Sequence, residues 1–299
     1  MTTTLHELLA NPEAGDLTDV IDLDRYPIHE PGSRAWCELL DRAHERLDDD
    51  GCLVLDGFLL PAALRLAAEE IGEMASHVSI RRHSSTVYAR KDIEMSLPAD
   101  DPRIRALTWH AGHVTRDMIP PYTVAHRVYA SSYFKAFVAA CTRRERVFEY
   151  ADPLAGLVAT VLPPTGAYPW HYDTNEYVAT IMTRKPDVGG TFEYCADLRG
   201  PDSENLAGLA DVLSGDHPEM IRSVEIEPGD LQLFLGRYSL HQVTPTAGVT
   251  DRHVMVFSYA DRPGVIGPVD RTRAVYGRVT EAHLVAEALA AVSADGLIL

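Results

Sequence analysis

VEIEPGDLQLFLGRYSLHQVTPTAGVTDRHVMVFSY, residues 224–259, consists of short apolar runs separated by turn signals such as Pro-Gly-Asp. Runs bounded in this way predict short strands. Similar runs precede this stretch, and the strands expected in all are residues 147–150, 157–162, 177–182, 191–194, 224–226, 231–235 and 254–259. Many short strands at close spacing favour a mainly β fold with a double-stranded β-helix core, the jelly roll of cupin-like proteins.

Helices are predicted on both sides of the strand-rich region. After Ser33, an N-cap residue type, apolar residues recur at helical spacing up to Leu47, and a second helix follows Pro61. The run CLVL at 52–55 predicts a buried strand between them. Further helices are expected near 131–142 and at 280–292. The fold is therefore expected to be mainly β with flanking helices.

The chain is expected to form a single domain with four consecutive parts. These are an irregular N-terminal arm at 1–32, a helical lead-in with a lid at 33–145, the jelly-roll core at 146–262 and a C-terminal helical cap at 263–299. The lid is expected within residues 77–125, which are rich in His, Arg, Ser and Pro and have no clean period. A segment that only covers the surface is the alternative for those residues.

The charge balance argues against nucleic acid and anionic membranes as partners. The 299 residues include 27 basic and 44 acidic side chains, so the net charge of −17 repels phosphate groups. No signal peptide or membrane span is recognisable, and the four cysteines are far apart, so we expect a cytoplasmic protein with reduced thiols. A small-molecule substrate is the expected partner, and the sequence leaves the oligomeric state open.

The first candidate for chemistry is the triplet His171-Tyr172-Asp173. In an extended segment residues i and i+2 project to the same side, so His171 and Asp173 can offer a nitrogen and an oxygen to one metal ion. The chain has a second triplet of this kind, His217-Pro218-Glu219, and 13 histidines and 44 acidic residues give about two by chance. The second triplet lies in a Pro-interrupted loop, so the first is the better metal-site candidate.

A second histidine strengthens the case for the first triplet. His241 follows it by 70 residues, in the strand-like segment GRYSLHQV. Two histidines and one carboxylate can form a facial triad, which leaves metal positions open and is typical of non-haem Fe(II) oxygenases. The alternative for each of the three residues is a hydrogen-bonded structural role.

Arg252 is the next candidate, 11 positions after His241 at the start of the predicted strand RHVMVFSY. It can lie on a strand next to the metal site, where its planar guanidinium would pair with a carboxylate in two parallel hydrogen bonds. A surface arginine is the alternative. The adjacent His253 should point to the opposite face of the strand, which excludes it as a metal ligand.

Taken together, HYD, GGTFEY, EPGDLQLF, GRYSLH and the following Arg resemble the Fe(II)/2-oxoglutarate-dependent oxygenases. More narrowly, residues 170–273 resemble the bacterial group of free-amino-acid hydroxylases and lysine-type radical halogenases. The stretches that carry this narrower resemblance are FEYCADLRGPDSEN, GDLQLFLGRYSLHQVTP and SYADRPGVIG. The resemblance implies Fe(II), 2-oxoglutarate as co-substrate and O2.

The resemblance also implies roles for single residues. His171, Asp173 and His241 would be the iron ligands, and Arg252 would hold 2-oxoglutarate. Related oxygenases often carry Ser two positions after that arginine, where this chain has Val254. The halogenases carry a small residue at the position of Asp173, and chloride takes the vacated place. With a carboxylate present, the resemblance implies hydroxylation, with desaturation or cyclisation as variants.

Candidate substrate contacts lie beside the metal motif and in the lid. An amino-acid zwitterion needs both signs of charge: Glu176 and Glu193 could hold an ammonium group, and His110, Arg116 or Arg237 a carboxylate. Glu193 could instead point outward from its strand. The full set of candidates, with neighbours in the lid, is Trp109, His110, His113, Arg116, Asn175, Glu176, Glu193, Arg237 and Tyr238. Lysine is the first amino acid to test.

Two alternatives from other functional classes stay open. One is a cupin-like metal enzyme, such as a zinc hydrolase or isomerase, that does not use 2-oxoglutarate, and Arg252 argues against it. The other is a non-catalytic jelly-roll binding protein in which the histidines and the aspartate are structural. Failure to bind Fe(II) would favour the second alternative.

Overall fold

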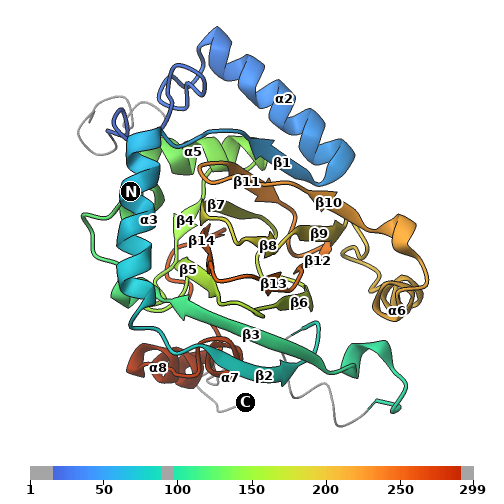
Figure 1. Ribbon diagram of the computed structural model, residues 1–299. Helices are drawn as coiled ribbons and strands as arrows, with labels where there is room; N and C mark the ends of the chain where they lie inside the picture. Colours follow the sequence, from blue (N-terminus) through green and yellow to red (C-terminus); the bar gives the residue numbers. More distant parts are fainter. Residues whose placement is uncertain (1–15, 89–96, 291–299) are drawn as a thin grey trace.

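Two facing β-sheets form the centre of the computed structural model, which describes residues 16–88 and 97–290 (Figure 1). The larger sheet has the strand order β1-β11-β7-β14-β5-β3-β2. Its strands are β1 (Cys52–Leu55), β2 (Arg81–Ser85), β3 (Leu107–Val114), β5 (Leu157–Leu162), β7 (Val178–Arg184), β11 (Leu231–Phe234) and β14 (Arg252–Phe257). All neighbouring strands in it pair antiparallel.

The smaller sheet has the order β10-β9-β12-β6 and is also antiparallel. Its strands are β6 (Tyr168–His171), β9 (Phe192–Cys195), β10 (Arg222–Val224) and β12 (Leu240–Val243). Two short ribbons pair β8 (Val188–Gly189) with β13 (Thr246–Ala247) and β4 (Phe148–Glu149) with β15 (Tyr259–Ala260). This arrangement confirms the predicted double-stranded β-helix.

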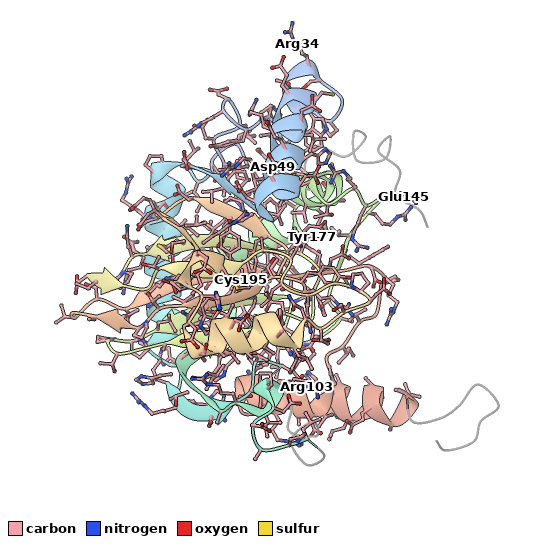
Figure 2. The ribbon with its side chains drawn as sticks, turned by 90° about the vertical axis from the view of Figure 1, so that its right-hand side faces the viewer. Arg34, Asp49, Arg103, Glu145, Tyr177 and Cys195 are labelled. Atoms are coloured by element: carbon pink, nitrogen blue, oxygen red, sulfur yellow. The ribbon has the colours of Figure 1, made fainter. Side chains whose placement is uncertain are left out.

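Helices cover the outer face of the larger sheet and the ends of the fold. The helices are α2 (Arg34–Asp50), α3 (Pro61–Ala75), α4 (Val124–Ala130), α5 (Ser132–Cys141), α6 (Leu206–Ser214), α7 (Val269–Tyr276) and α8 (Glu281–Ala290). Short 3-10 helices span Pro102–Ile104, Arg116–Met118 and Pro218–Met220. Figure 2 shows α2 at one end of the sheets and α8 at the other.

Helix α2 follows the sequence signals closely. The Ser33 side chain accepts a hydrogen bond from the Trp36 amide, and the helix ends at Gly51, whose φ of 68° suits glycine. Its buried residues Trp36, Leu39, Ala43 and Leu47 form one face, as the periodicity predicts. Among the described residues, no helix is both long and apolar enough to cross a membrane.

Alternation along β14 gives the larger sheet two different faces. Met255 and Phe257 belong to the main apolar core shared with the helices, whereas Arg252, Val254 and Val256 line a cavity between the sheets. Since successive residues of a strand point to opposite faces, one strand serves both the core and the site. Each fully buried apolar side chain in that core stabilises the fold by about 1.5–3 kcal/mol.

The predicted lid segment contains regular structure that the sequence did not reveal. Strands β2 and β3 lie within 77–125 and extend the larger sheet through pairing of β3 with β5. Strand β3 lacks a clean apolar alternation because its Trp109 and His113 line the cavity. Residues 16–32 consist mainly of turns and bends, and their buried Leu17, Val20 and Ile28 join the main core. The first 15 residues of the predicted arm and the last residues of the predicted C-terminal helix lie outside the described residues.

Candidate functional site

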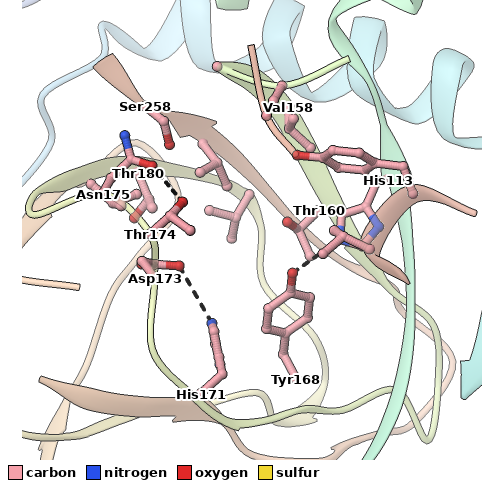
Figure 3. A pocket seen from close by; sticks show the side chains of 18 of the residues that line it. His113, Val158, Thr160, Tyr168, His171, Asp173, Thr174, Asn175, Thr180 and Ser258 are labelled. Carbon is pink, nitrogen blue, oxygen red and sulfur yellow. Dashed lines mark hydrogen bonds and ion pairs between the residues drawn. The ribbon is translucent and has the colours of Figure 1, made fainter. Parts of the chain in front are cut away.

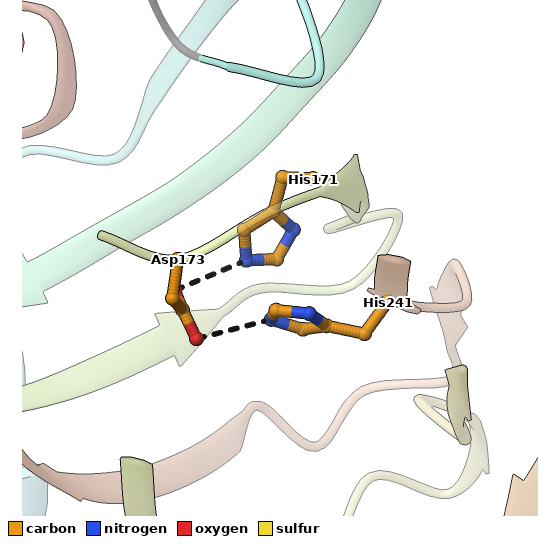
Figure 4. Close-up of side chains that lie close together, drawn as sticks. All are labelled: His171, Asp173 and His241. Carbon is orange, nitrogen blue, oxygen red and sulfur yellow. Dashed lines mark ion pairs between the residues drawn. The ribbon is translucent and has the colours of Figure 1, made fainter. Parts of the chain in front are cut away.

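Three side chains converge where β6 and β12 pair (Figure 4). His171 and His241 are direct partners in this antiparallel ladder, and Asp173 follows β6. The Nε2 atom of His241 lies 3.4 Å from Asp173 Oδ2, and that of His171 lies 3.9 Å from Asp173 Oδ1. One donor atom from each residue falls within 4.8 Å of the others, a spacing that fits one metal ion.

Backbone carbonyls set the tautomer of both histidines. The Nδ1–H of His171 donates to Pro169 O at 2.8 Å, and that of His241 donates to Ser239 O at 2.9 Å. A carbonyl oxygen can only accept, so Nδ1 carries the proton and Nε2 keeps its lone pair. Metal-ligating histidines usually have such a partner on the other ring nitrogen. The structure thus presents both Nε2 atoms as ligands.

The position of Asp173 is fixed by its close contact with the backbone of Gly236. Its amide donates to Gly236 O at 3.0 Å. A Cβ atom on Gly236 would overlap Asp173 Oδ2 and would lie 3.0 Å from its Cβ and Cγ. Glycine is therefore required at position 236 if the carboxylate is to keep its place beside the histidines.

Electrostatics hold His171 and Asp173 in the protonation states that a metal needs. Burial, and then the neighbouring His241, lowers the pKa of His171 to about 3. Burial alone would raise the pKa of Asp173, but His241, His171 and Arg271 together lower it to about 2. A neutral imidazole and an ionised carboxylate bind a cation directly. Two nitrogens and one oxygen match the ligand set of non-haem Fe(II) sites.

The three residues open into a cavity of about 210 Å³ between the two sheets. Figure 3 shows His171 and Asp173 at its wall, with Tyr168 beside His113. The Tyr168 hydroxyl and His113 Nε2 are 3.2 Å apart. Val158, Thr160, Thr180 and Ser258 line the wall formed by the larger sheet and the residue that follows β14.

Arg252 reaches the same cavity from the opposite sheet. From the sequence, Arg252 is expected on a strand beside the metal site, but β14 belongs to the larger sheet and β12 to the smaller one. Arg252 is only 5% exposed, and among the described residues its Nε has no hydrogen-bond partner and no carboxylate pairs with it. Burial lowers its pKa to about 10, so it is still charged at neutral pH. A buried unpaired cation is costly, and an anionic ligand would relieve that cost.

The wall next to Arg252 supplies a hydroxyl group that the sequence analysis missed. Val254 faces the cavity and has none, but its partner in the β14–β5 ladder is Thr160, which also lines the cavity. The cross-strand register, which cannot be read from one segment alone, places them side by side.

Most of the predicted substrate contacts lie outside this cavity. Only Asn175, Trp109 and His113 line it. Glu176 pairs with Arg144 and, with Arg237, lines a second, smaller cavity. His110 lies on β3 opposite Arg82 of β2, and its Nδ1 is near Arg82 and Thr165 O. Arg116 pairs with Glu149 at 3.0 Å.

Alternation along β9 explains why Glu193 misses the cavity. Its neighbour Phe192 lines the cavity, whereas Glu193 accepts a hydrogen bond from Gln242 at 2.8 Å. Sequence reasoning also missed lining residues from segments far apart in the chain. These are Tyr150, Asp152, Tyr168, Arg271 and Tyr276. No pattern near them marked a site, because only the packing of α7 against the sheets brings them together.

The fold and the ligands define a double-stranded β-helix protein with a site for metal binding by two histidines and one carboxylate. Residues 37–271 match the family model described as HalD, Halogenase D, and the chain belongs to this family. No curated protein sequence matches it.

Solved structures with the same fold are distant in sequence. The epimerase SnoN in complex with Fe3+, alpha ketoglutarate and nogalamycin RO aligns with a TM-score of 0.52 at 13% identity, over 75% of this chain and 84% of SnoN. AviO1 from Streptomyces viridochromogenes Tue57 aligns with a TM-score of 0.51 at 16% identity, over 76% of this chain and 97% of AviO1. At this identity the similarity establishes the shared fold.

Proposed function

We propose that the protein is an Fe(II)- and 2-oxoglutarate-dependent oxygenase that hydroxylates an unactivated C–H bond of a free amino acid and releases succinate and CO2. The observation that carries the proposal is that a His-Asp-His cluster and a buried arginine line the same cavity. No carboxylate among the described residues pairs with this arginine. A metal site alone would fit many cupin-like enzymes. A second, buried cation opposite it fits a co-substrate that has two anionic ends.

Each residue has a defined task in this proposal. His171, Asp173 and His241 would hold the iron, which when bound supplies O2 activation coupled to decarboxylation of 2-oxoglutarate. Arg252 would pair with the distal carboxylate of 2-oxoglutarate, and its planar fork fixes the direction of that carboxylate. Thr160 would offer a hydroxyl donor to the same group. Burial of Arg252 strengthens such an electrostatic interaction, because less water screens it.

Asp173 supports hydroxylation over halogenation, although the family is described by the name of a halogenase. A carboxylate at this position occupies the metal site that a halide ion would need. The halogenases that this sequence resembles carry a small residue there. The ligand set of this chain is therefore complete without chloride.

Two properties of the sequence support a free amino acid as the substrate. The narrow sequence resemblance points to free amino acids, and the net charge of −17 disfavours polyanions as partners. The alternative, a cupin-like enzyme that does not use 2-oxoglutarate, leaves the burial of Arg252 without an explanation.

The proposal is tested by measuring Fe(II) binding without O2, and succinate formation from 2-oxoglutarate once O2 is admitted. His241→Ala should abolish both, because it removes one of three ligands. His217→Ala is the matched control, since His217 is an exposed histidine that also has a nearby carboxylate, Glu219, at 2.8 Å. If His241→Ala retained turnover, the proposed site would be wrong.

A further inference from the structure

The cavity contains a second arginine with no role in holding the metal or 2-oxoglutarate. Arg271 lies on α7 and lines the cavity. Within the described part of the chain it makes one hydrogen bond, from Nη1 to the carbonyl oxygen of Tyr88, at 3.0 Å. No carboxylate among the described residues forms an ion pair with it. Part of its donor set therefore stays available to a ligand.

A further donor in the cavity wall is buried without a partner among the described residues. Trp109 is 4% exposed, and its Nε1–H has no hydrogen-bond partner there. A buried polar atom is rarely left unsatisfied, and it costs about 1–3 kcal/mol when it is. An acceptor on a bound ligand would satisfy it.

The described residues that line the cavity include no carboxylate that is free to pair with a ligand. The carboxylates that line the cavity are Asp173, which belongs to the metal cluster, and Asp152. Asp152 accepts hydrogen bonds from the amides of Leu154, Ala155 and Gly267 and pairs with His283 at 3.1 Å. The described lining residues thus leave no carboxylate for a cationic side chain of a substrate.

The two arginines enter the cavity from opposite ends. Arg252 begins β14, opposite Leu162, whereas Ser258, just past the other end of β14, donates its amide to Gly156 O. The loop leading to α7 is tied to this second end, because Asp152 holds the Gly267 amide. Six residues of strand separate the ends by about 20 Å. One molecule of 2-oxoglutarate at Arg252 therefore leaves Arg271 for a different ligand.

We infer that Arg271, assisted by Trp109, binds the carboxylate of the substrate, and that this substrate has no cationic side chain. The inference rests on the proposed function and narrows its substrate class. An α-ammonium group is compatible with it, since the substrate's own carboxylate is next to that group and Tyr150, Tyr168 and Tyr276 line the same cavity. Lysine, the first candidate from the sequence, would place a second ammonium group among described lining residues that leave no free counterion.

The substrate class is tested with the twenty common L-amino acids and ornithine, by measuring succinate formation with Fe(II), 2-oxoglutarate and O2. Amino acids with uncharged side chains should accelerate succinate formation. Lysine, arginine and ornithine should leave it at the rate measured without any amino acid. Aromatic walls can attract cations through their faces, so the cationic acids are an informative part of the panel. If lysine or ornithine gave the largest acceleration, or if no acid accelerated the reaction, the inference would be wrong.

The role of Arg271 is tested on the best acid of that panel with Arg271→Gln and Arg271→Lys. Arg271→Gln should weaken binding about 10- to 100-fold, the loss expected for hydrogen bonds to a charged group, and Arg271→Lys should recover part of it. Calorimetric titration of the acid into protein with Fe(II) and 2-oxoglutarate, without O2, measures this separately from turnover. The primary amide of the same acid should bind wild type weakly and discriminate little between wild type and Arg271→Gln.

Arg273→Gln is the matched control, because Arg273 lies on the same helix but is exposed beside Asp270. It should bind the acid as wild type does. Equal affinity of wild type and Arg271→Gln, in a protein that converts 2-oxoglutarate to succinate, would overturn this inference alone. Absence of any succinate formation by wild type would instead overturn the proposed function.

Discussion

His171 and His241 face each other across the ladder between β6 and β12, with ring centroids 4.1 Å apart. The pair exists because of strand register: a slip of one residue would turn one imidazole to the other face of the sheet. The ladder becomes irregular just after His241, between His241 and Val243. Formation of the smaller sheet and assembly of the two nitrogen ligands are therefore one event.

Arg252→Ala should raise the 2-oxoglutarate concentration needed for half-maximal turnover at least about 100-fold while leaving Fe(II) affinity unchanged. The reason is that loss of one partner of a buried charge pair costs about 3–5 kcal/mol. Steady-state kinetics with varied 2-oxoglutarate measure the effect, and exposed Arg222, paired with Asp50, provides the control Arg222→Ala. Unchanged 2-oxoglutarate kinetics would contradict the assignment of Arg252.

Wild-type protein should add oxygen and no chlorine to its substrate in chloride buffer, since Asp173 fills the position a halide needs. Mass spectrometry of the product distinguishes the two masses directly. Asp173→Gly should allow chloride to bind near the iron, detectable by a chloride-dependent change in the absorption spectrum. A chlorinated product from the wild-type protein would refute the argument from the ligand set.

Gly236→Ala should weaken Fe(II) binding at least about 10-fold, because the new Cβ displaces the Asp173 carboxylate. Gly200→Ala is the control, since a Cβ there meets nothing within 4 Å and neither glycine has a positive φ. Equilibrium dialysis of Fe(II) without O2 gives the affinities. Equal affinity in both variants would show that the close approach at Gly236 does not position the carboxylate.

His253→Phe should reduce the loss of stability on acidification. His253 is buried on the helix-covered face of β14, and burial, followed by the charge of Arg184, lowers its pKa from 6.5 to about 4. Between pH 6.5 and pH 4 the imidazole is protonated in the unfolded chain but neutral in the folded protein. The free energy of unfolding therefore decreases as the pH is lowered. From pH 7 to pH 5 this accounts for about 2 kcal/mol.

Urea unfolding of wild type and His253→Phe at pH 7 and pH 5 measures that difference. The variant should lose about 2 kcal/mol less than wild type over this range. The exposed His217→Phe variant should keep nearly the full loss, because solvent screens its charge. A parallel decline in wild type and His253→Phe would rule out His253 as a source of acid sensitivity.

Local patterns predicted much of the fold and the metal cluster. Apolar runs with turn signals located β5, β7, β9 and β11 to within a few residues, and the i, i+2 spacing placed His171 and Asp173 on one side. These features depend on a few neighbouring residues, which a single sequence contains. The distant His241 could be added because its strand-like context was clear.

Long-range packing decided what local patterns could not. Arg252 was expected beside the metal ligands but faces them from the other sheet, because strand neighbours are set by topology and not by distance along the chain. Arg271 was not singled out, since helix α7 has no strong periodicity and gains its role by docking at the cavity mouth. Glu193 was equally compatible with either face until its register with Gln242 was known.

The buried Asp152 has a consequence for how tightly a small molecule can be held. The Asp152 carboxylate accepts hydrogen bonds from amides that precede β5 and α7, and it pairs with His283 of α8. It thereby connects three chain segments around the end of the cavity that contains Arg271. A wall braced in this way has little conformational entropy left to lose when a ligand arrives. Contacts made there should therefore appear almost fully as binding free energy, which lets a molecule of few atoms be recognised with useful affinity.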